Sequence, residues 1–338
     1  MKKKWFIGVD VSKTWIDVSC LESDSTVPSI EEQFENSLAG FDKLRSWLEK
    51  NNIKPEDCLF CLEHTGTYML MLLTWLNLNS IDTVVEPALQ IKRSIGIQRG
   101  KNDQIDARRI AEYASVFHKK LKLFELPSMT LLSVKQLLSY RQQLVKSCTM
   151  FKNSLKNHLQ YNQLTNNKQV TEDIEQQIER LKESITSVEK QIYKTLESDQ
   201  MVKKNFDLSK SVKGIGLILA AMIVVNSNNF TSFTDARKFN CYTGVAPFEY
   251  SSGSSIRGSS QTSHLGNKIL KSLLMNGANS AARYDSELRN YYKRKRAEGK
   301  DHKLVMNAIA AKLIGRVFAV VKRQSPYVET YKNIIEIA

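Results

Sequence analysis

The sequence predicts three parts in order: an α/β N-terminal domain with a mixed sheet over residues 1–125, a long helical coiled-coil arm over residues 126–204, and a mainly α C-terminal domain over residues 205–338. In the first part, short apolar runs alternate with helical patterns, which is typical of a sheet covered by helices. In the second part, apolar residues recur at steps of three and four, as in two long helices that pack side by side.

Basic residues outnumber acidic ones, with 49 Lys and Arg against 35 Asp and Glu, which gives a formal net charge of +14. Such a surplus indicates an anionic partner, nucleic acid first and a membrane surface second. No apolar run reaches the roughly 18 residues that a membrane-spanning helix needs, and the N-terminus lacks the apolar segment of a signal peptide. We therefore expect a cytoplasmic, nucleoid-associated protein without a membrane partner.

The cysteines are five in number and scattered over the chain, which predicts free thiols rather than a disulfide framework. Cys58 and Cys61 form a C-x-x-C pair within an apolar run. Residues three apart in a strand point to opposite faces of the sheet, so this pair is poorly arranged for a zinc ion.

Residues 5–13 contain a short apolar run, predicted as a buried strand, that delivers a carboxylate at Asp10 near its end. A partly desolvated carboxylate at a strand end is costly unless a cation or a hydrogen-bond donor meets it. Asp10 is therefore a candidate metal ligand. The alternative is an Asp that caps a turn.

The same pattern returns at Glu63, which ends a second apolar run. The remaining elements of this domain are predicted as strands over residues 15–20, 31–36 and 81–85 and as helices over 40–51 and 68–78. The helix over 68–78 is apolar and should be buried nearly all round.

A helix that begins near Asp103 carries Asp103 and Asp106 on one side, because residues three apart lie on the same helix face. Together with Asp10 and Glu63, these acids form an oxygen-rich set that suits two hard cations and in-line phosphoryl displacement. The alternative for the helix pair is an N-cap and a favourable first-turn charge, which leaves the two strand-end acids unexplained.

Three motifs carry a resemblance to a known family: Gly8-Val-Asp10-Val-Ser-Lys13, Glu63-His-Thr-Gly-Thr-Tyr68 and Lys101-Asn-Asp103-Gln-Ile-Asp106-Ala. This order resembles the DEDD catalytic domain of transposases of the insertion sequence 110 family. That domain is similar to the RuvC Holliday-junction resolvase and has a ribonuclease-H-like fold. Piv-type DNA invertases present the same motifs.

The resemblance implies that Asp10, Glu63, Asp103 and Asp106 bind Mg²⁺, with two ions expected. It also implies a bacterial or archaeal protein. Basic residues surround the last motif, where a phosphate backbone is expected to pass. Those that we expect to contact nucleic acid are Arg93, Arg99, Lys101 and Arg109.

The predicted arm has a basic first helix over residues 131–159 and a more acidic second helix, separated by a polar stretch over 161–171. Lys152 and Lys156 on the first helix are candidate nucleic-acid contacts, whereas the second helix suits solvent or a subunit face. The arm therefore serves either self-association, as a dimer or tetramer, or the clamping of nucleic acid.

In the C-terminal domain, residues 212–220 resemble the turn of a helix-hairpin-helix motif, in which glycines expose backbone N–H groups to phosphate. A tight turn into a buried helix is the equal alternative. Further along, tyrosines precede the cations Lys293, Arg294, Lys295 and Arg296, a combination that suits base stacking beside phosphate contacts, with a solvated charge run as the alternative.

The Ser/Gly stretch over residues 250–258 is a flexible loop on composition alone. It resembles the family's second conserved domain, which carries a nucleophilic serine directly before a glycine. That residue is Ser252 here, although Ser251 is adjacent and leaves the assignment open by one position. Arg257 follows as an expected nucleic-acid contact.

The leading interpretation is a DNA recombinase that cuts and rejoins strands through a covalent serine–DNA intermediate, at a site shared by the two domains. The resemblance also implies a structured guide RNA that pairs with donor and target DNA. The alternatives are a junction-resolving nuclease that uses water as nucleophile and a non-catalytic nucleic-acid scaffold. An actin-like ATPase is disfavoured, because no second glycine-rich phosphate loop occurs.

Overall fold

The computed structural model describes residues 3–23, 29–64, 66–94, 103–165, 168–248, 251–252, 256–257, 261–262 and 265–328. The chain divides into two compact units, residues 1–126 and 127–338. The predicted arm and the C-terminal helices lie in the same unit. Each unit is described by itself.

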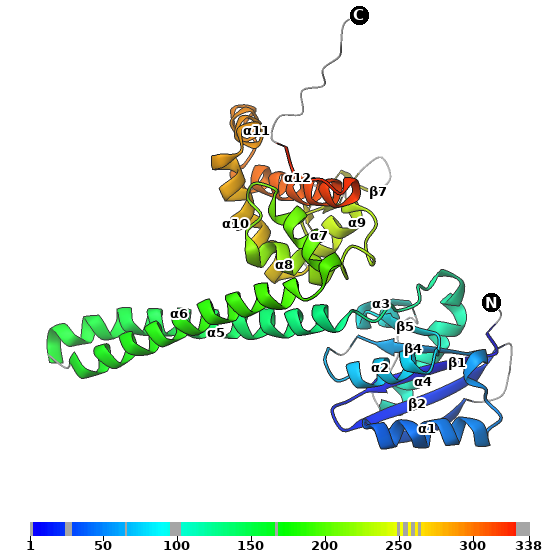
Figure 1. The fold of residues 1–338 in the computed structure, drawn as a ribbon. Helices are drawn as coiled ribbons and strands as arrows, with labels where there is room; N and C mark the ends of the chain where they lie inside the picture. The colour runs from blue at the N-terminus through cyan, green and yellow to red at the C-terminus, as the bar shows by residue number, and fades with distance from the viewer. Residues whose placement is uncertain are drawn as a thin grey trace, which may run out of the picture. The chain divides into compact units, whose positions relative to one another are not determined.

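Unit 1 is built on a five-stranded mixed sheet with the strand order β3-β2-β1-β4-β5 (Figure 1). The strands are β1 Trp5–Val11, β2 Trp15–Glu22, β3 Ile30–Glu35, β4 Cys58–Glu63 and β5 Thr83–Glu86. β1, β2 and β3 form an antiparallel meander, and β4 and β5 extend the sheet in parallel to β1. The α/β N-terminal part and its mixed sheet are confirmed.

Both faces of this sheet are covered, which explains why its central strands are apolar without interruption. On one face, residues such as Ile7 and Val9 pack with α1 (Leu38–Lys50) and α2 (Leu70–Leu78). On the other face, Phe6 and Cys61 pack with α4 (Asp103–Phe117). The short helices of the unit are α3 Ala88–Ser94, η1 Pro55–Asp57 and η2 His118–Lys120.

The prediction that the helix over residues 68–78 is buried nearly all round is wrong. Leu72 and Leu76 of α2 are fully buried, but Met71 is 49% exposed and Leu78 is 78% exposed. α2 lies on the outside of its layer, so only the face toward α1 and the sheet is covered.

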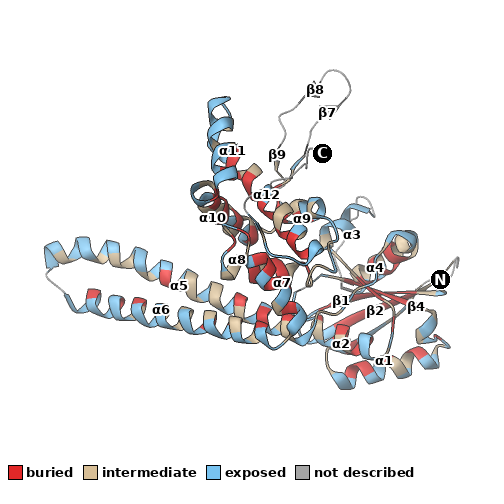
Figure 2. Cartoon of the chain, turned by 45° about the horizontal axis from the view of Figure 1, so that its top comes forward, coloured by how far each residue is buried: buried red, intermediate tan, exposed pale blue. Residues whose placement is uncertain are grey.

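The arm consists of two long helices, α5 (Met129–Thr165) and α6 (Lys168–Glu197), which lie side by side (Figure 1). The predicted polar separator is mostly helical, because it contains no Gly or Pro to stop either helix, and Asn162 donates a hydrogen bond to Thr171 across the turn at 3.0 Å. At the base of the arm, side chains such as Leu131 and Ile192 join the main core of unit 2. Beyond it, much of the arm surface is exposed (Figure 2).

The rest of unit 2 is mainly helical, as predicted. Its elements are α7 Gln200–Lys210, α8 Leu217–Asn226, α9 Ala236–Thr243, α10 Lys268–Tyr284, α11 Ser286–Ala297 and α12 His302–Arg323, with the two-residue strands β6 Pro247–Phe248, β7 Ser251–Ser252, β8 Ile256–Arg257 and β9 Gln261–Thr262. Five of the helices begin at an Asp or Asn whose side chain accepts a backbone N–H, as N-caps do: α7, α9, α10, α11 and α12.

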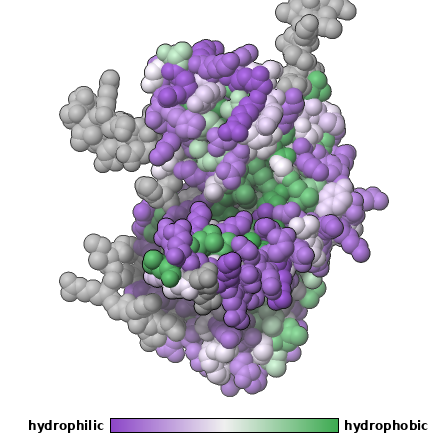
Figure 3. All heavy atoms as spheres, turned by 90° about the vertical axis from the view of Figure 1, so that its left-hand side faces the viewer, coloured by the Kyte–Doolittle hydropathy of each residue, from purple (hydrophilic) through white to green (hydrophobic). Residues whose placement is uncertain are grey.

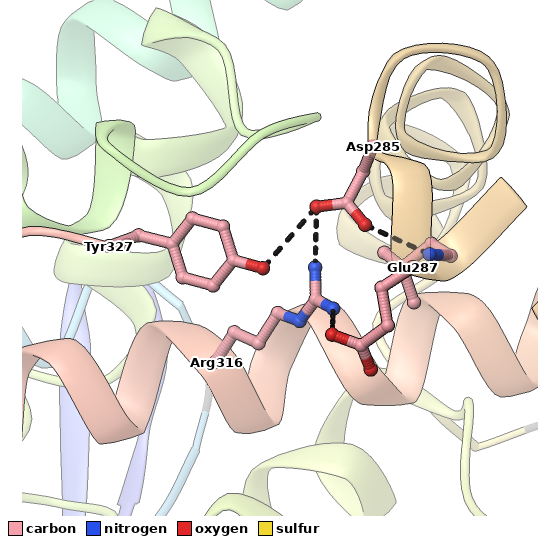
Figure 4. Close-up of polar contacts among 5 residues, drawn as sticks. Asp285, Glu287, Arg316 and Tyr327 are labelled. Carbon is pink, nitrogen blue, oxygen red and sulfur yellow. Dashed lines mark hydrogen bonds and ion pairs between the residues drawn. The ribbon is translucent and has the colours of Figure 1, made fainter. Parts of the chain in front are cut away.

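A buried ion pair joins α10, α11 and α12 (Figure 4). The carboxylate of Asp285 is fully buried and caps α11 by accepting the N–H of Leu288 at 2.9 Å. Arg316 donates to Asp285 at 2.8 Å and to Glu287 at 2.6 Å, and the hydroxyl of Tyr327 donates to Asp285 at 3.3 Å. A buried carboxylate with this many donors is a structural group.

Among the described helices, only α12 is long and apolar enough to span a membrane by length and composition. Half of its most apolar stretch is buried, and residues such as Ile309 and Leu313 lie in the core of unit 2. All five cysteines are free, as expected. Cys58 and Cys61 lie in the clusters on opposite faces of the sheet, and burial raises the pKa of each thiol to about 12.

Candidate functional site

The position of α4 on the sheet is set by Gly8. A Cβ atom at this position would lie 2.1 Å from the carbonyl oxygen of Ala107 and 2.3 Å from the backbone nitrogen of Ala111. The helix backbone therefore rests directly on β1, at a place where only glycine fits. Because Asp106 directly precedes Ala107, this contact brings the first turn of α4 toward the end of β1 that carries Asp10.

Strand register places a line of carboxylates across that end of the sheet. Val9 is paired with Leu62 in the parallel β1–β4 ladder, so Asp10 and Glu63 are the next residues on neighbouring strands. Glu63 is in turn the partner of Glu86 on β5, and Asp10 is the partner of Asp17 on β2. We call Asp17, Asp10, Glu63 and Glu86 the acid row.

The acid row faces the α4 side of the sheet. Side chains alternate along a strand, so Asp10 shares a face with Gly8, and Glu63 shares one with Cys61. Gly8 touches α4, and Cys61 packs in the cluster beneath α4. The sheet and the helix thus bring Asp10, Glu63 and the first turn of α4 together, as the sequence predicts.

Of the two predicted metal ligands on α4, Asp103 and Asp106, only Asp106 has a described side chain. Its Oδ1 accepts a hydrogen bond from Nη1 of Arg109 at 2.8 Å, and both side chains are partly buried. Asp103 is the first residue of α4, and its side chain lies outside the described residues.

Two members of the acid row were missed by sequence reasoning. Glu86 ends a third apolar run, Val84-Val85-Glu86, which is the signal that Asp10 and Glu63 gave. Burial raises the pKa of Glu86, while a hydrogen bond from Tyr113 at 3.5 Å opposes the rise. Asp17 lies inside β2, is 5% exposed and accepts a hydrogen bond from Gln33 at 3.0 Å. Its position opposite Asp10 is known only from the strand pairing in the structure.

Carboxylate oxygens are the donors that a hard divalent cation prefers, and the acid row presents them on one face of the sheet. Among the described side chains, no three Asp, Glu, His or Cys residues stand close enough together to hold an ion. The described set lacks the side chain of Asp103, and Asp106 is engaged by Arg109.

The cations expected around α4 divide into two kinds. Arg109 contacts Asp106, whereas Arg93 at the end of α3 is exposed to solvent. Arg108, also basic, pairs through Nε with Glu31 on β3 at 2.7 Å. Arg99 and Lys101 lie outside the described residues.

The segment that carries Ser252 begins and ends on a fixed base in unit 2. β6 pairs with β9, which joins the chain on either side of the segment. Gly244 ends α9 with a φ of 73°, and a Cβ at Gly266 would lie 2.5 Å from the Gly244 Cα atom, so the two backbones touch. Asn307 on α12 donates a hydrogen bond to the carbonyl of Val245.

On this base, β7 pairs with β8 so that Ser252 is opposite Ile256 and Ser251 is opposite Arg257. The side chains of all four residues lie outside the described set. The roles expected of Ser252 and Arg257 therefore stay predictions.

The predicted hairpin lies between α7 and α8 and borders a shallow cavity of about 610 Å³. Gly214 has a φ of 93°, and a Cβ there would lie 2.6 Å from the carbonyl of Gly277 on α10. Gly216 is the N-cap of α8, and no side-chain hydrogen bond caps the helix. The first backbone N–H groups of α8 are therefore available beside the cavity, in the way that helix starts bind phosphate.

The predicted basic contacts of unit 2 lie on helix surfaces. Lys152 and Lys156 on α5 are exposed, and so are Lys293, Arg294 and Arg296 on α11. Lys295 is partly buried and pairs with Glu298 at 2.6 Å, and Arg296 donates to the carbonyl of Lys300 at 2.6 Å. The expected contacts of this stretch with nucleic acid stay predictions.

Two family models match the chain. Residues 7–163 match the model of a transposase family, the DEDD transposase of IS110 elements, and residues 207–293 match that of the transposase IS116/IS110/IS902 family. The chain therefore belongs to the insertion sequence 110 family of transposases and recombinases.

Relatives with curated names include the pilin gene-inverting proteins of Moraxella bovis and Moraxella lacunata. Each is 27% identical to this chain over 332 residues, which cover 96% of the chain and 98% of the relative. An uncharacterized 43.6 kDa protein of the insertion element IS110 from Streptomyces coelicolor is 33% identical over 128 residues, or 38% of the chain and 31% of the relative.

Proposed function

We propose that this chain is a DNA recombinase that cuts and rejoins strands to move or invert a DNA segment, by way of a covalent Ser252–DNA intermediate. Strand register carries the proposal: it sets Asp10 beside Glu63, next to the first turn of α4. The relatives named for pilin gene inversion match over nearly their whole length, which supports recombination of DNA as the activity.

In the proposed site, Asp10, Glu63, Asp103 and Asp106 hold Mg²⁺, which requires that Asp106 release its present partner, Arg109. When bound, two such ions supply Lewis-acid stabilisation of the charge that develops on the phosphate oxygens. Asp10 and Glu63 hold their carboxylates at a rigid end of the sheet. The motifs that contain these acids are also those on which the similarity of this domain to ribonuclease-H-like enzymes rests.

The proposed chemistry conserves the energy of the phosphodiester bond. The Ser252 oxygen loses its proton and forms a bond to phosphorus, while the bond from phosphorus to the leaving strand breaks and that strand departs with a hydroxyl group. Attack by the hydroxyl of a new strand reverses these events and restores the serine. Hydrolysis by water, as in a junction-resolving nuclease, lacks this second step.

We propose that nucleic acid contacts exposed cations of α5 and α11 and the hairpin between α7 and α8 in unit 2, and separately the exposed Arg93 of α3 in unit 1. The face of the molecule in Figure 3 is largely hydrophilic, with smaller hydrophobic patches among the polar residues. A DNA substrate and a structured guide RNA both suit a net charge of +14. We propose that the arm also joins copies of the chain into a dimer or tetramer, as a coiled coil does.

The adduct is the decisive experiment. Incubation with Mg²⁺, guide RNA and a cognate DNA with a nick that traps the intermediate should give a protein–DNA species that survives denaturation and maps to Ser252. Ser252→Ala should abolish the species and all joining but still bind DNA. If Ser251→Ala is the inactive variant instead, the nucleophile is the neighbouring serine. Normal cleavage by both variants without an adduct would establish water as the nucleophile.

The contribution of α11 is tested by the salt dependence of binding. Replacing Lys293, Arg294, Lys295 and Arg296 with Gln should weaken binding to all DNA sequences. The slope of log K against log salt should fall by up to about four, because each cation that contacts a phosphate contributes about one. Fluorescence anisotropy over a salt series measures this slope. An unchanged slope would assign all four cations to a solvated face.

A further inference from the structure

A rigid turn lies at the end of β1, directly after the acid row. Within residues 12–15, the N–H and hydroxyl of Ser12 each donate to the carbonyl of Trp15 at 2.9 Å, and the N–H of Trp15 donates to the Ser12 hydroxyl at 3.1 Å. Asn36, which lies outside the turn, also holds it. The backbone N–H of Asn36 donates to the carbonyl of Thr14 at 2.9 Å, and its side-chain amide donates to the carbonyls of Ser12 at 2.9 Å and Tyr68 at 3.0 Å. The turn is thereby fixed to both neighbouring loops.

The first strand residue after this turn is an exposed tryptophan. Trp15 is 44% exposed, whereas Ile16 and Val18 beside it are buried. A tryptophan buries roughly 150–250 Å² when it packs fully, so on the order of 100 Å² of this indole faces solvent. A large apolar side chain held on a fixed backbone loses little further entropy when a ligand covers it.

Strand alternation places Trp15 on the same face as the acid row. Trp15 and Asp17 are two residues apart in β2, so their side chains point to the same side of the sheet, and Asp17 is the register partner of Asp10. Two strand residues span roughly 7 Å. This is close enough for the nucleotide that adjoins a phosphate held at the acids.

We propose that Trp15 stacks on an unpaired DNA base next to the phosphate that is cut, while Lys13 on the same turn contacts the backbone of that strand. The inference rests on the proposed function of the acid row. An exposed aromatic beside an exposed cation is the combination that single-stranded nucleic acid requires, one for the base and one for the phosphate. Because bases in a duplex have no free face, the proposal also requires that the DNA be unpaired at this position.

The test compares two single strands of equal length, an oligothymidylate and an abasic strand with the same backbone. Binding is measured by fluorescence anisotropy with the full-length Asp10→Asn variant, so that no cleavage interferes. Trp15→Ala in this background should weaken binding to oligothymidylate by about 5- to 100-fold, the worth of one base stack, and leave binding to the abasic strand unchanged. Trp15→Phe should retain most of the affinity.

Matched variants separate stacking from other roles. Lys13→Gln should weaken binding to both strands equally, because a phosphate contact does not depend on the base. Met71→Ala, at a comparably exposed apolar residue on α2, should change the affinity for neither strand.

An equal loss of affinity for both strands in Trp15→Ala, or no loss for either strand, would overturn the proposal. A shift in oligomeric state by sedimentation, without loss of DNA affinity, would assign Trp15 to a protein interface. Since these readouts require no cleavage, failure of the proposed nuclease chemistry would be seen separately, in the adduct experiment.

Discussion

Carboxylates in unit 1 and in unit 2 have opposite electrostatic surroundings. In unit 2, Asp285 is fully buried and is met by Arg316, by Tyr327 and by the start of α11. In unit 1, Glu63 has like charges at neighbouring positions on both sides, from Asp10 and Glu86, and it has no ion pair within the described residues. Like charges that face each other across strands are destabilising. The buried carboxylate of unit 2 therefore serves the fold, whereas the acid row of unit 1 contains the strand acids for which a ligand role is proposed.

The largest expected effect is on catalysis by the acid row. Glu63→Gln and Asp10→Asn should each lower the rate of strand cleavage by at least about 10³-fold, because each removes a charged ligand from the proposed Mg²⁺ site. A gel assay with saturating DNA measures the rate.

Stability should respond differently. Glu63→Gln should leave the free energy of unfolding unchanged or raise it by up to about 1 kcal/mol, since it relieves repulsion with its neighbours. Urea unfolding monitored by circular dichroism measures this difference. Cleavage at a near-normal rate, or a large loss of stability, would remove the distinction between the two groups of acids.

The next largest effect concerns Arg316. Arg316→Met should lower the free energy of unfolding of unit 2 by about 3–5 kcal/mol, because it leaves the carboxylate of Asp285 buried without its cation. Thermal unfolding measures the loss. Glu287→Gln is the matched control: this side chain is 67% exposed, so its removal should cost less than about 1 kcal/mol. Similar losses for both variants would contradict the structural role assigned to the buried pair.

The smallest effect is a pH dependence in unit 1. The hydrogen bond from Arg108 lowers the pKa of Glu31 below 4.5 in the folded state. A lowered pKa means that the ionised form is stabilised by folding, so the contribution is present above pH 4.5 and is lost as the pH falls through the folded value. Arg108 is half exposed, which limits the contribution to about 1 kcal/mol at most.

Urea unfolding of the wild type and Glu31→Gln at about pH 7 and about pH 3 tests this pair. The variant should be less stable at the higher pH and nearly equal to the wild type at the lower pH. A difference that is larger at the lower pH would mean that Arg108 does not stabilise the charged form of Glu31.

The acid row shows both the reach and the limit of sequence reasoning. Asp10 and Glu63 were predictable because each ends an apolar run, and apolar runs with both faces covered mark buried strands. Glu86 ends such a run too, but it was missed because Pro87 directly after it was read as the start of a loop. Asp17 gives no sequence signal, because its importance comes from pairing with Asp10 across two strands, and register depends on contacts distant in sequence.

The helices of unit 2 show the same division. α8 was predicted as the buried helix after the hairpin, whereas α11 was read only as a basic run. Its start has a local signal, the N-cap at Asp285, but its stability comes from burial of Leu288 and from the ion pair with α12. The break between the arm helices was predicted too long for the opposite reason: polarity was taken as a loop signal where no residue stops a helix.

The base of the arm has a mechanical consequence. α5 contains 37 residues, or about 55 Å of helix at roughly 1.5 Å per residue. Its first turns and the last turns of α6 are embedded in the same core as α7 and α8, which flank the hairpin. A tilt of about 5° at that base displaces the far end by roughly 5 Å over this length. The arm therefore acts as a lever. A molecule bound at its tip applies a torque that packed side chains transmit to the hairpin, because no linker separates the base of the arm from the core that carries the hairpin.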